Sequence, residues 1–188
     1  MDGTASSVPL IARPSFDRAC SFVPSEYVQA WEWFLREEQR GGLWDKLPHR
    51  TTADSPQYPF RLSIDSELFP VSRDSGIFWP GRGRVKRPRE KTFALSVHNS
   101  KRGAYPDVPP LYLEDGTWVF KYSSQSASVE NWRDQDYNQK MINCMECGVP
   151  VGVFFATSAG YKVLGLAFVE RYEPENGWFV LHGPVHKG

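Results

Sequence analysis

The stretch VPVGVFFATSAGYKVLGLAFVERYEPENGWFVL, residues 149–181, decides the fold class of this chain. Its turn-forming residues Ser158-Ala-Gly160 and Glu173-Pro-Glu-Asn-Gly177 divide it into three parts. Each part is rich in β-branched and aromatic residues, and such runs predict strands over 149–156, 161–172 and 177–181. Because a short turn joins the last two runs, we expect them to form a hairpin.

The region before this stretch has the same texture, with one helix inserted. Shorter runs predict strands over 60–64, 92–98 and 117–122. A helix is predicted from Asp134, a capping residue, to Gly148, a stop signal, because Tyr137, Met141 and Met145 recur at four-residue spacing. The order of elements predicts an α+β domain on a curved antiparallel, β-barrel-like sheet with flanking helices.

A second helix is predicted over residues 25–40, ahead of all the strands. Ser25 is expected to be its N-cap and Gly41 the residue that ends it. Its apolar residues repeat at three- and four-residue spacing, which is typical of a helix that packs on a core. The proline-containing residues after it suggest a linker. We therefore expect an N-terminal extension over 1–58 and a single domain over 59–188.

The composition of the chain limits its class. It has 188 residues, 40% of them hydrophobic, and a formal net charge of zero, which suits one globular domain. No run of eighteen apolar residues is present, so no membrane span is expected. The N-terminus lacks the features of a signal peptide, and three cysteines are too few for a disulfide scaffold. A reduced, cytoplasmic protein is the expectation.

Positive charge is concentrated in one part of the chain. Residues 73–102 contain nine Lys or Arg and two acidic side chains, a net charge of +7, whereas residues 103–148 have a net charge of −4. The densest piece, 81–90, contains Gly and Pro and is predicted to be a basic loop. Arginine outnumbers lysine there and suits phosphate recognition, although a solvated loop is the alternative.

No motif of a known catalytic site is present. The sequence lacks G-x-S-x-G, a phosphate-binding loop, H-E-x-x-H and the zinc deaminase signature. We expect no catalytic residue and no cofactor, and a hydrolase with an unfamiliar site remains an alternative. Cys144 and Cys147 have the spacing of half a zinc site, and His182 and His186 are candidates for the other half. A zinc-stabilised interaction domain is therefore an alternative to cysteines that simply pack on a helix.

One group of side chains suits a flat aromatic guest. Tyr105 is followed two residues later by Asp107, and Tyr122 is followed directly by Ser123. Two rings can sandwich a base, a carboxylate can accept a hydrogen bond from the amino group of cytosine, and a hydroxyl can contact its carbonyl edge. The alternative is that the tyrosines are core residues and that Asp107 caps a turn.

At these residues the chain resembles the SRA (SET- and RING-associated) domain family, whose members read 5-methylcytosine by flipping the base out of the duplex. The resemblance extends from about Gly76 to Pro184. In particular, the chain is similar to the modified-DNA reader half of bacterial SRA–HNH restriction endonucleases. The motifs that carry it are Val85-Lys-Arg-Pro88, Tyr105-Pro-Asp107, Asp115-Gly116, Trp118-Val-Phe-Lys-Tyr122-Ser123, Asp134-Gln-Asp-Tyr-Asn138 and Val149-Pro-Val-Gly-Val153.

The resemblance implies a role for each matched residue. Tyr105 and Tyr122 would stack on the flipped base, Asp107 would bind its amino group, and Ser123 would help to fix its polar edge. A strip that presents backbone groups to the base would be His98, Asn99 and Ser100. This strip is not glycine-rich as in the family, and the loop that fills the vacated space is shortened to about 125–131. The residues expected to contact phosphate are Arg82, Arg84, Lys86, Arg87, Arg89, Lys101 and Arg102.

The resemblance also implies partners. The expected ligand is double-stranded DNA that carries modified cytosine, either 5-methylcytosine or 5-hydroxymethylcytosine. The chain would be the recognition part of a type IV restriction endonuclease whose HNH nuclease domain lies C-terminal to it, and a homodimer is a second possible partner. The alternative function is RNA binding by a PUA-like domain.

Overall fold

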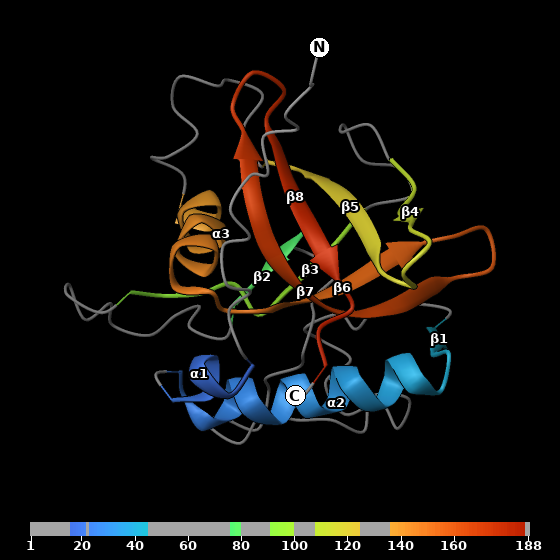
Figure 1. Ribbon diagram of the computed structural model, residues 1–188, viewed down its shortest axis with the longest axis horizontal. Helices are drawn as coiled ribbons and strands as arrows, with labels where there is room; N and C mark the ends of the chain where they lie inside the picture. Colours follow the sequence, from blue (N-terminus) through green and yellow to red (C-terminus); the bar gives the residue numbers. More distant parts are fainter. Residues whose placement is uncertain are drawn as a thin grey trace, which may run out of the picture.

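The computed structural model describes residues 16–21, 23–44, 76–79, 91–99, 108–124 and 136–186. They form an eight-stranded sheet with two helices, α2 and α3, packed against it and a third, α1, packed on α2 (Figure 1). The helices are α1 (Phe16–Cys20), α2 (Ser25–Gln39) and α3 (Asp136–Cys147). The strands are β1 (Leu43–Trp44), β2 (Ile77–Phe78), β3 (Ser96–His98), β4 (Leu111–Tyr112), β5 (Trp118–Ser123), β6 (Val151–Ala156), β7 (Tyr161–Glu173) and β8 (Trp178–Gly183).

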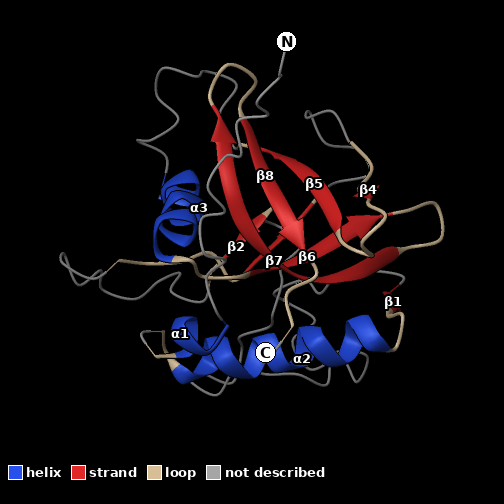
Figure 2. Ribbon diagram, viewed as in Figure 1, coloured by secondary structure: helices blue, strands red, loops and turns tan. Residues whose placement is uncertain are grey.

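The sheet has the strand order β2-β3-β6-β7-β8-β5-β4, and β1 pairs with the start of β7 (Figure 2). The predicted α+β class with a curved sheet is confirmed. The sheet is not closed, because β2 and β4 are at opposite ends of the strand order. The expectation of a wholly antiparallel sheet is wrong at one pair, β3 and β6, which run parallel. The chain between these two strands contains β4, β5 and α3, which is long enough for a crossover that restores the strand direction.

Strand β7 produces much of the curvature. Its first half pairs with β6, its second half pairs with β8, and both ladders contain a register shift. One shift lies between Val153 and Phe154, and the other lies between Val169 and Arg171. Gly165, which pairs with Val153, has a φ of 102°, a conformation that side chains rarely allow. Because bulges bend a strand and increase its twist, β7 turns from one part of the sheet into the other.

The N-terminal helix α2 belongs to the core of the described residues. It lies across the end of the sheet in Figure 1 and packs on β6 and β7. The Tyr27 hydroxyl donates a 2.7 Å hydrogen bond to the carbonyl of Phe93. The Phe34 ring packs edge-to-face on Phe154 at 5.2 Å between centroids and lies against Gly152, where a Cβ atom would overlap it. The predicted apolar stripe of this helix therefore packs on the strands.

The helix ends show which local signals were correct. Helix α2 begins at Ser25 and its N-cap is Pro24, with no side-chain capping bond, so the prediction of Ser25 as N-cap is wrong. The serine occupies the first helical position because Pro24 has the extended conformation expected of the flanking residue. Gly41 and Gly148 both have a φ of 65° immediately beyond their helices, which confirms the two predicted stops. Asp134 lies outside the described residues.

The longer predicted strands are found close to their expected positions. Strands β6, β7 and β8 match the runs 149–156, 161–172 and 177–181, and the last two form the predicted hairpin. Strand β5 matches 117–122, whereas β3 forms only over the last three residues of the predicted run 92–98, and the run 60–64 lies outside the described residues. Strands β1, β2 and β4 were not predicted, because two residues are too few for a periodic pattern. None of the helices in the described residues has the length and apolarity to span a membrane.

Candidate nucleic-acid interface

The structure describes four of the seven residues predicted to bind a base. They are His98, Asn99, Tyr122 and Ser123, whereas Ser100, Tyr105 and Asp107 lie outside the described residues. The predicted phosphate contacts also lie outside them, namely Arg82, Arg84, Lys86, Arg87, Arg89, Lys101 and Arg102. The described part of the candidate site therefore consists of residues at or just after the ends of β3 and β5.

Tyr122 is positioned by the alternation of β5. Trp118, Phe120 and Tyr122 face the core, and the Tyr122 side chain is only 5% exposed. Its ring lies 6.3 Å from that of Phe120, measured between centroids. Alternation along the strand explains this burial, because every second residue of β5 faces the packed side of the sheet. For a base to stack on Tyr122, the side chains that cover its ring would have to move aside.

Ser123 has its side chain on the opposite face of β5 from Tyr122. The direction of its backbone N–H and C=O follows from the hydrogen bond of the next residue. The amide of Ser124 donates to the carbonyl of Gly177 at 2.8 Å, so Ser124 is hydrogen-bonded to the β8 side. Hydrogen-bonded and non-hydrogen-bonded pairs alternate along antiparallel strands, so the N–H and C=O of Ser123 point away from β8. Among the described strands, β4 covers this edge of β5 only at Trp118 and Val119.

Asn99 follows β3 and is anchored by its side chain. Its Oδ1 accepts a 2.7 Å hydrogen bond from the backbone amide of Ala156 at the end of β6. This bond fixes the amide orientation, because only the oxygen can accept. The Nδ2 atom is buried and has no hydrogen-bond partner among the described residues. A buried donor of this kind is unusual, and a bound ligand would satisfy it.

His98 is the last residue of β3 and is 5% exposed. Its Nδ1 lies 3.1 Å from the carbonyl oxygen of Asn99. A carbonyl only accepts, so Nδ1 is the protonated nitrogen in this contact. The imidazole also packs edge-on against Tyr161 at 6.1 Å between centroids. The histidine thus holds the end of β3 against the start of β7.

Two phenylalanines that were not predicted connect the ends of β3 and β5. Phe120 lies next to Tyr122 and packs edge-to-face on Phe155 at 5.7 Å between centroids. Phe155 precedes Ala156, whose amide is bound by Asn99. Tyr122 is therefore linked to Asn99 through the rings of Phe120 and Phe155 and then through the backbone amide of Ala156. The alternating aromatic residues of β5 were the signal for Phe120, whereas nothing in the sequence pointed to Phe155.

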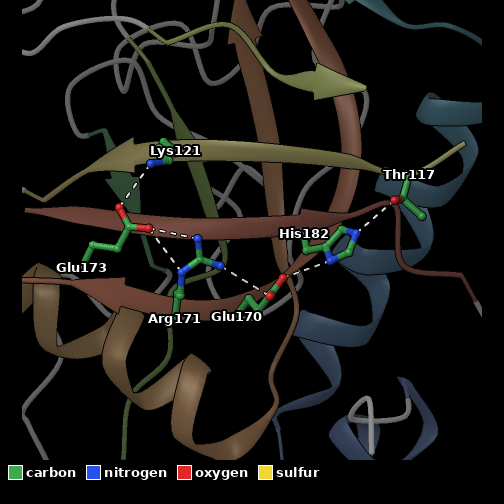
Figure 3. A network of polar contacts seen from close by, with 6 residues as sticks. All are labelled: Thr117, Lys121, Glu170, Arg171, Glu173 and His182. Carbon is green, nitrogen blue, oxygen red and sulfur yellow. Dashed lines mark hydrogen bonds and ion pairs between the residues drawn. The ribbon is translucent and has the colours of Figure 1, made fainter. Parts of the chain in front are cut away.

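The other face of this sheet carries a network of charged side chains (Figure 3). Glu173 bridges Lys121 and Arg171 at 3.2 and 2.9 Å, and Arg171 also contacts Glu170. The hydrogen bond from Lys121 and the bonds from Arg171 hold the pKa of Glu173 below its usual value. Because both cations are paired with carboxylates, this face is a poor surface for phosphate.

His182 extends the network to the β4–β5 hairpin (Figure 3). Its Nδ1 lies 3.0 Å from Glu170 Oε2, and its Nε2 lies 3.0 Å from Thr117 Oγ1. The Thr117 hydroxyl donates in turn to Asp115 Oδ1 at 2.6 Å, so it accepts from the imidazole. Asp115, one of the residues that carry the family resemblance, therefore orders the hairpin turn.

The four residues of the zinc alternative have separate partners. The Cys144 thiol donates to the carbonyl of Ala94 at 3.5 Å, and burial raises its pKa. Cys147 lies beside Lys91, and His186 contacts Glu38 at 3.2 Å. No three His, Cys, Asp or Glu side chains gather as a metal site in the part of the chain that the structure describes. The zinc alternative therefore has no site there.

Comparison with known proteins gave two results. No family model and no curated protein matches the chain. Among solved structures, the chain is similar to the SUVH5 SRA domain in complexes with hemimethylated CG DNA (TM-score 0.40, 19% identity) and methylated CHH DNA (0.40, 20%). It is also similar to the complex with fully methylated CG DNA (0.41, 18%), and each match covers 78% of this chain and 89% of that chain.

Proposed function

We propose that this chain recognises modified cytosine in double-stranded DNA by taking the base out of the helix. The observation that carries the proposal is the buried Nδ2 of Asn99, directly after β3, which lacks a partner among the described residues. In the sequence, Tyr105 and Asp107 follow Asn99 by six and eight residues. Asn99 is linked to Tyr122 through Phe120 and Phe155, whose rings pack edge-to-face on each other.

Each group has a definite role in this proposal. Tyr105 and Tyr122 stack on the two faces of the base, and Asp107 accepts a hydrogen bond from its exocyclic amino group. The Nδ2 of Asn99 donates to the carbonyl of the base, which satisfies the buried donor. Ser123 contributes its backbone groups, since they point to the open edge of β5 whereas its side chain faces away from Tyr122.

The energies are consistent with such a reader. Taking a base out of the stack costs a few kcal/mol. Stacking on an aromatic side chain returns about 1–3 kcal/mol per base. A methyl group adds roughly 0.8 kcal/mol when it is fully enclosed. Discrimination between modified and unmodified cytosine is therefore modest unless a polar or steric effect at the 5-position adds to the enclosure of the methyl group.

The basic segment 73–102 supplies affinity that does not depend on sequence. Its net charge of +7 suits contacts with several phosphates, and such contacts weaken as salt increases. The residues proposed for them remain Arg82, Arg84, Lys86, Arg87, Arg89, Lys101 and Arg102. The paired cations on the outer face of β5 and β7 are not part of this surface.

We further propose that the chain is the recognition part of a modification-dependent restriction endonuclease, and that the cleaving site lies in an HNH nuclease domain or partner. In this proposal residues 59–188 form the DNA-reading unit. Residues 1–58 extend it through helix α2, which is packed on β6 and β7.

A gel-shift titration tests the proposal. One duplex is used in versions that carry cytosine, 5-methylcytosine or 5-hydroxymethylcytosine at the same position, and structured RNA is used as competitor. We expect tighter binding to one modified duplex and little competition by RNA. A fluorescent adenine analogue beside the target base should brighten on binding if the base leaves the stack. Equal affinity for all three duplexes, or preferential binding of the RNA, would refute the reader function.

A further inference from the structure

Three consecutive apolar residues are exposed at one edge of the sheet. Leu111 is 63% exposed, Tyr112 57% and Leu113 37%. We call these three residues the β4 strip. Leu43, which is 54% exposed, lies nearby, since it pairs with Lys162 and the Nζ of Lys162 is 3.4 Å from the Tyr112 hydroxyl. Consecutive large apolar side chains are rarely left in water without an interaction to make.

On the side away from β5, the backbone of the strip has no partner strand among the described residues. Strand β4 is at the end of the strand order, and β5 is its only partner among the described strands. The Leu113 amide donates to the Thr117 carbonyl, so the 113–117 pair is hydrogen-bonded and the next pair, Tyr112 and Trp118, is not. The N–H and C=O of Tyr112 therefore point to the open side. An unpaired edge of this kind is a template for another strand.

The ends of the strip limit what can pair with it. Pro109 and Pro110 precede it and cannot donate hydrogen bonds. A tight turn follows it, in which Gly116 has a φ of 81° and its amide donates to the carbonyl of Leu113. Pairing is thus confined to about three residues, which favours a discrete contact over open-ended aggregation.

We propose that the β4 strip pairs with the same strip of a second copy of this chain. An antiparallel pairing centred on Tyr112 lets each Tyr112 exchange both backbone hydrogen bonds with the Tyr112 of the second copy. The same register places Leu111 opposite Leu113 of the second copy, and Leu113 opposite Leu111. The strip is therefore self-complementary, as a two-fold interface requires.

The charges around the strip support this occupant. Glu114 and Asp115 are exposed directly after the strip, and Lys162 lies beside Tyr112. In the antiparallel register Glu114 of one copy lies opposite Pro110 of the other, two residues from the Tyr112 that contacts Lys162, so the pairing brings opposite charges to the same region. Two exposed carboxylates make the same surface unfavourable for DNA phosphates. DNA also has no strand backbone to pair with Tyr112.

The contact is small, so the expected self-association is weak. Interfaces well below about 1,200 Å² belong to transient complexes. Sedimentation velocity of the full chain over about a hundredfold range of concentration should show a reversible monomer–dimer equilibrium. Tyr112→Pro removes the open-side donor without breaking a bond to β5 and should abolish the dimer.

A charge swap provides the matched control. Glu114→Lys and Lys162→Glu should each weaken the dimer about three- to tenfold, and the double variant should restore it to within about twofold. Circular dichroism checks that each variant is folded. A wild-type chain that stays monomeric overturns the proposal, and so does a dimer that neither Tyr112→Pro nor the single charge variants weaken. An unchanged sedimentation profile with weaker DNA binding in Leu111→Ser would assign the strip to DNA, which also overturns it.

Discussion

Gly152 of β6 lies directly against the Phe34 ring of α2, so closely that a Cβ atom at position 152 would overlap three atoms of the ring. The contact joins a helix near the N-terminus to a strand in the second half of the chain. It requires glycine for its lack of a side chain and phenylalanine for the ring that fills the space. The helix and the sheet therefore share one core.

Gly152→Ala should destabilise the chain by about 1–3 kcal/mol, because the added methyl group forces the Phe34 ring or the strand to move. Urea unfolding measures the change. Phe34→Leu will itself lower stability, but in that background the added methyl group should cost less. Equal costs in both backgrounds would show that the strand backbone, and not the ring, resists the substitution.

Tyr105→Ala should weaken binding to the modified duplex by about five- to 150-fold, which corresponds to the loss of one stacking contact of about 1–3 kcal/mol, and should remove the preference over the unmodified duplex. Competition gel shifts with the two duplexes measure the preference. Tyr105→Phe retains the ring and should keep most of it. If Tyr105→Ala remains folded and keeps the full preference, Tyr105 is not a wall of the base site.

Charge reversal at Arg84 and Arg87 should weaken binding to every duplex and flatten the dependence of affinity on salt. The reason is that phosphate contacts release counterions and do not read the base. Titrations at several salt concentrations measure both effects. The matched control reverses Arg36 and Arg40, exposed residues near the end of α2, and changes the net charge equally. A similar loss in the control would indicate a general effect of net charge.

Asn99→Ala should lower the free energy of unfolding by about 1–3 kcal/mol, because the partly buried amide of Ala156 loses its acceptor. It should also reduce affinity for the modified duplex, because the Nδ2 donor is removed. Asn143→Ala is the control, since that side chain is also buried and donates to the Thr92 carbonyl at 2.8 Å. We expect Asn143→Ala to lower stability but not the preference for modified DNA. Loss of preference in both variants would trace the effect to reduced stability.

Glu173→Gln should lower stability at neutral pH and lose this effect in acid. The pKa of Glu173 is held below 4.5 by Lys121 and Arg171, so its ionised form stabilises the folded state. That contribution is present above pH 4.5 and disappears as the pH falls through the lowered pKa. Urea midpoints of the two proteins should therefore converge at low pH, whereas Glu175→Gln, in the exposed turn nearby, should follow the wild type throughout. A constant difference between Glu173→Gln and wild type at all pH values would contradict this assignment.

Local signals predicted much of the secondary structure. The helix stops at Gly41 and Gly148 were correct because each glycine has a positive φ that other residues avoid. The strand predicted over 117–122 was correct because its β-branched and aromatic residues suit a strand with one buried face. Ser25 failed as an N-cap because capping preference is a weak signal when a proline occupies the neighbouring position. Strands β1, β2 and β4 have two residues each and show no periodic pattern, so only their pairing with other strands identifies them.

The sequence by itself determined the α+β class, the three long C-terminal strands and the order of residues in the candidate base site. These depend on periodicity and turn chemistry, which are local properties of the chain. Only the tertiary structure decided that β3 and β6 run parallel, that Asn99 binds Ala156 and that Phe155 joins the two ends of the site. Those contacts join residues far apart in the sequence, and the energy that selects them appears only when the core is packed.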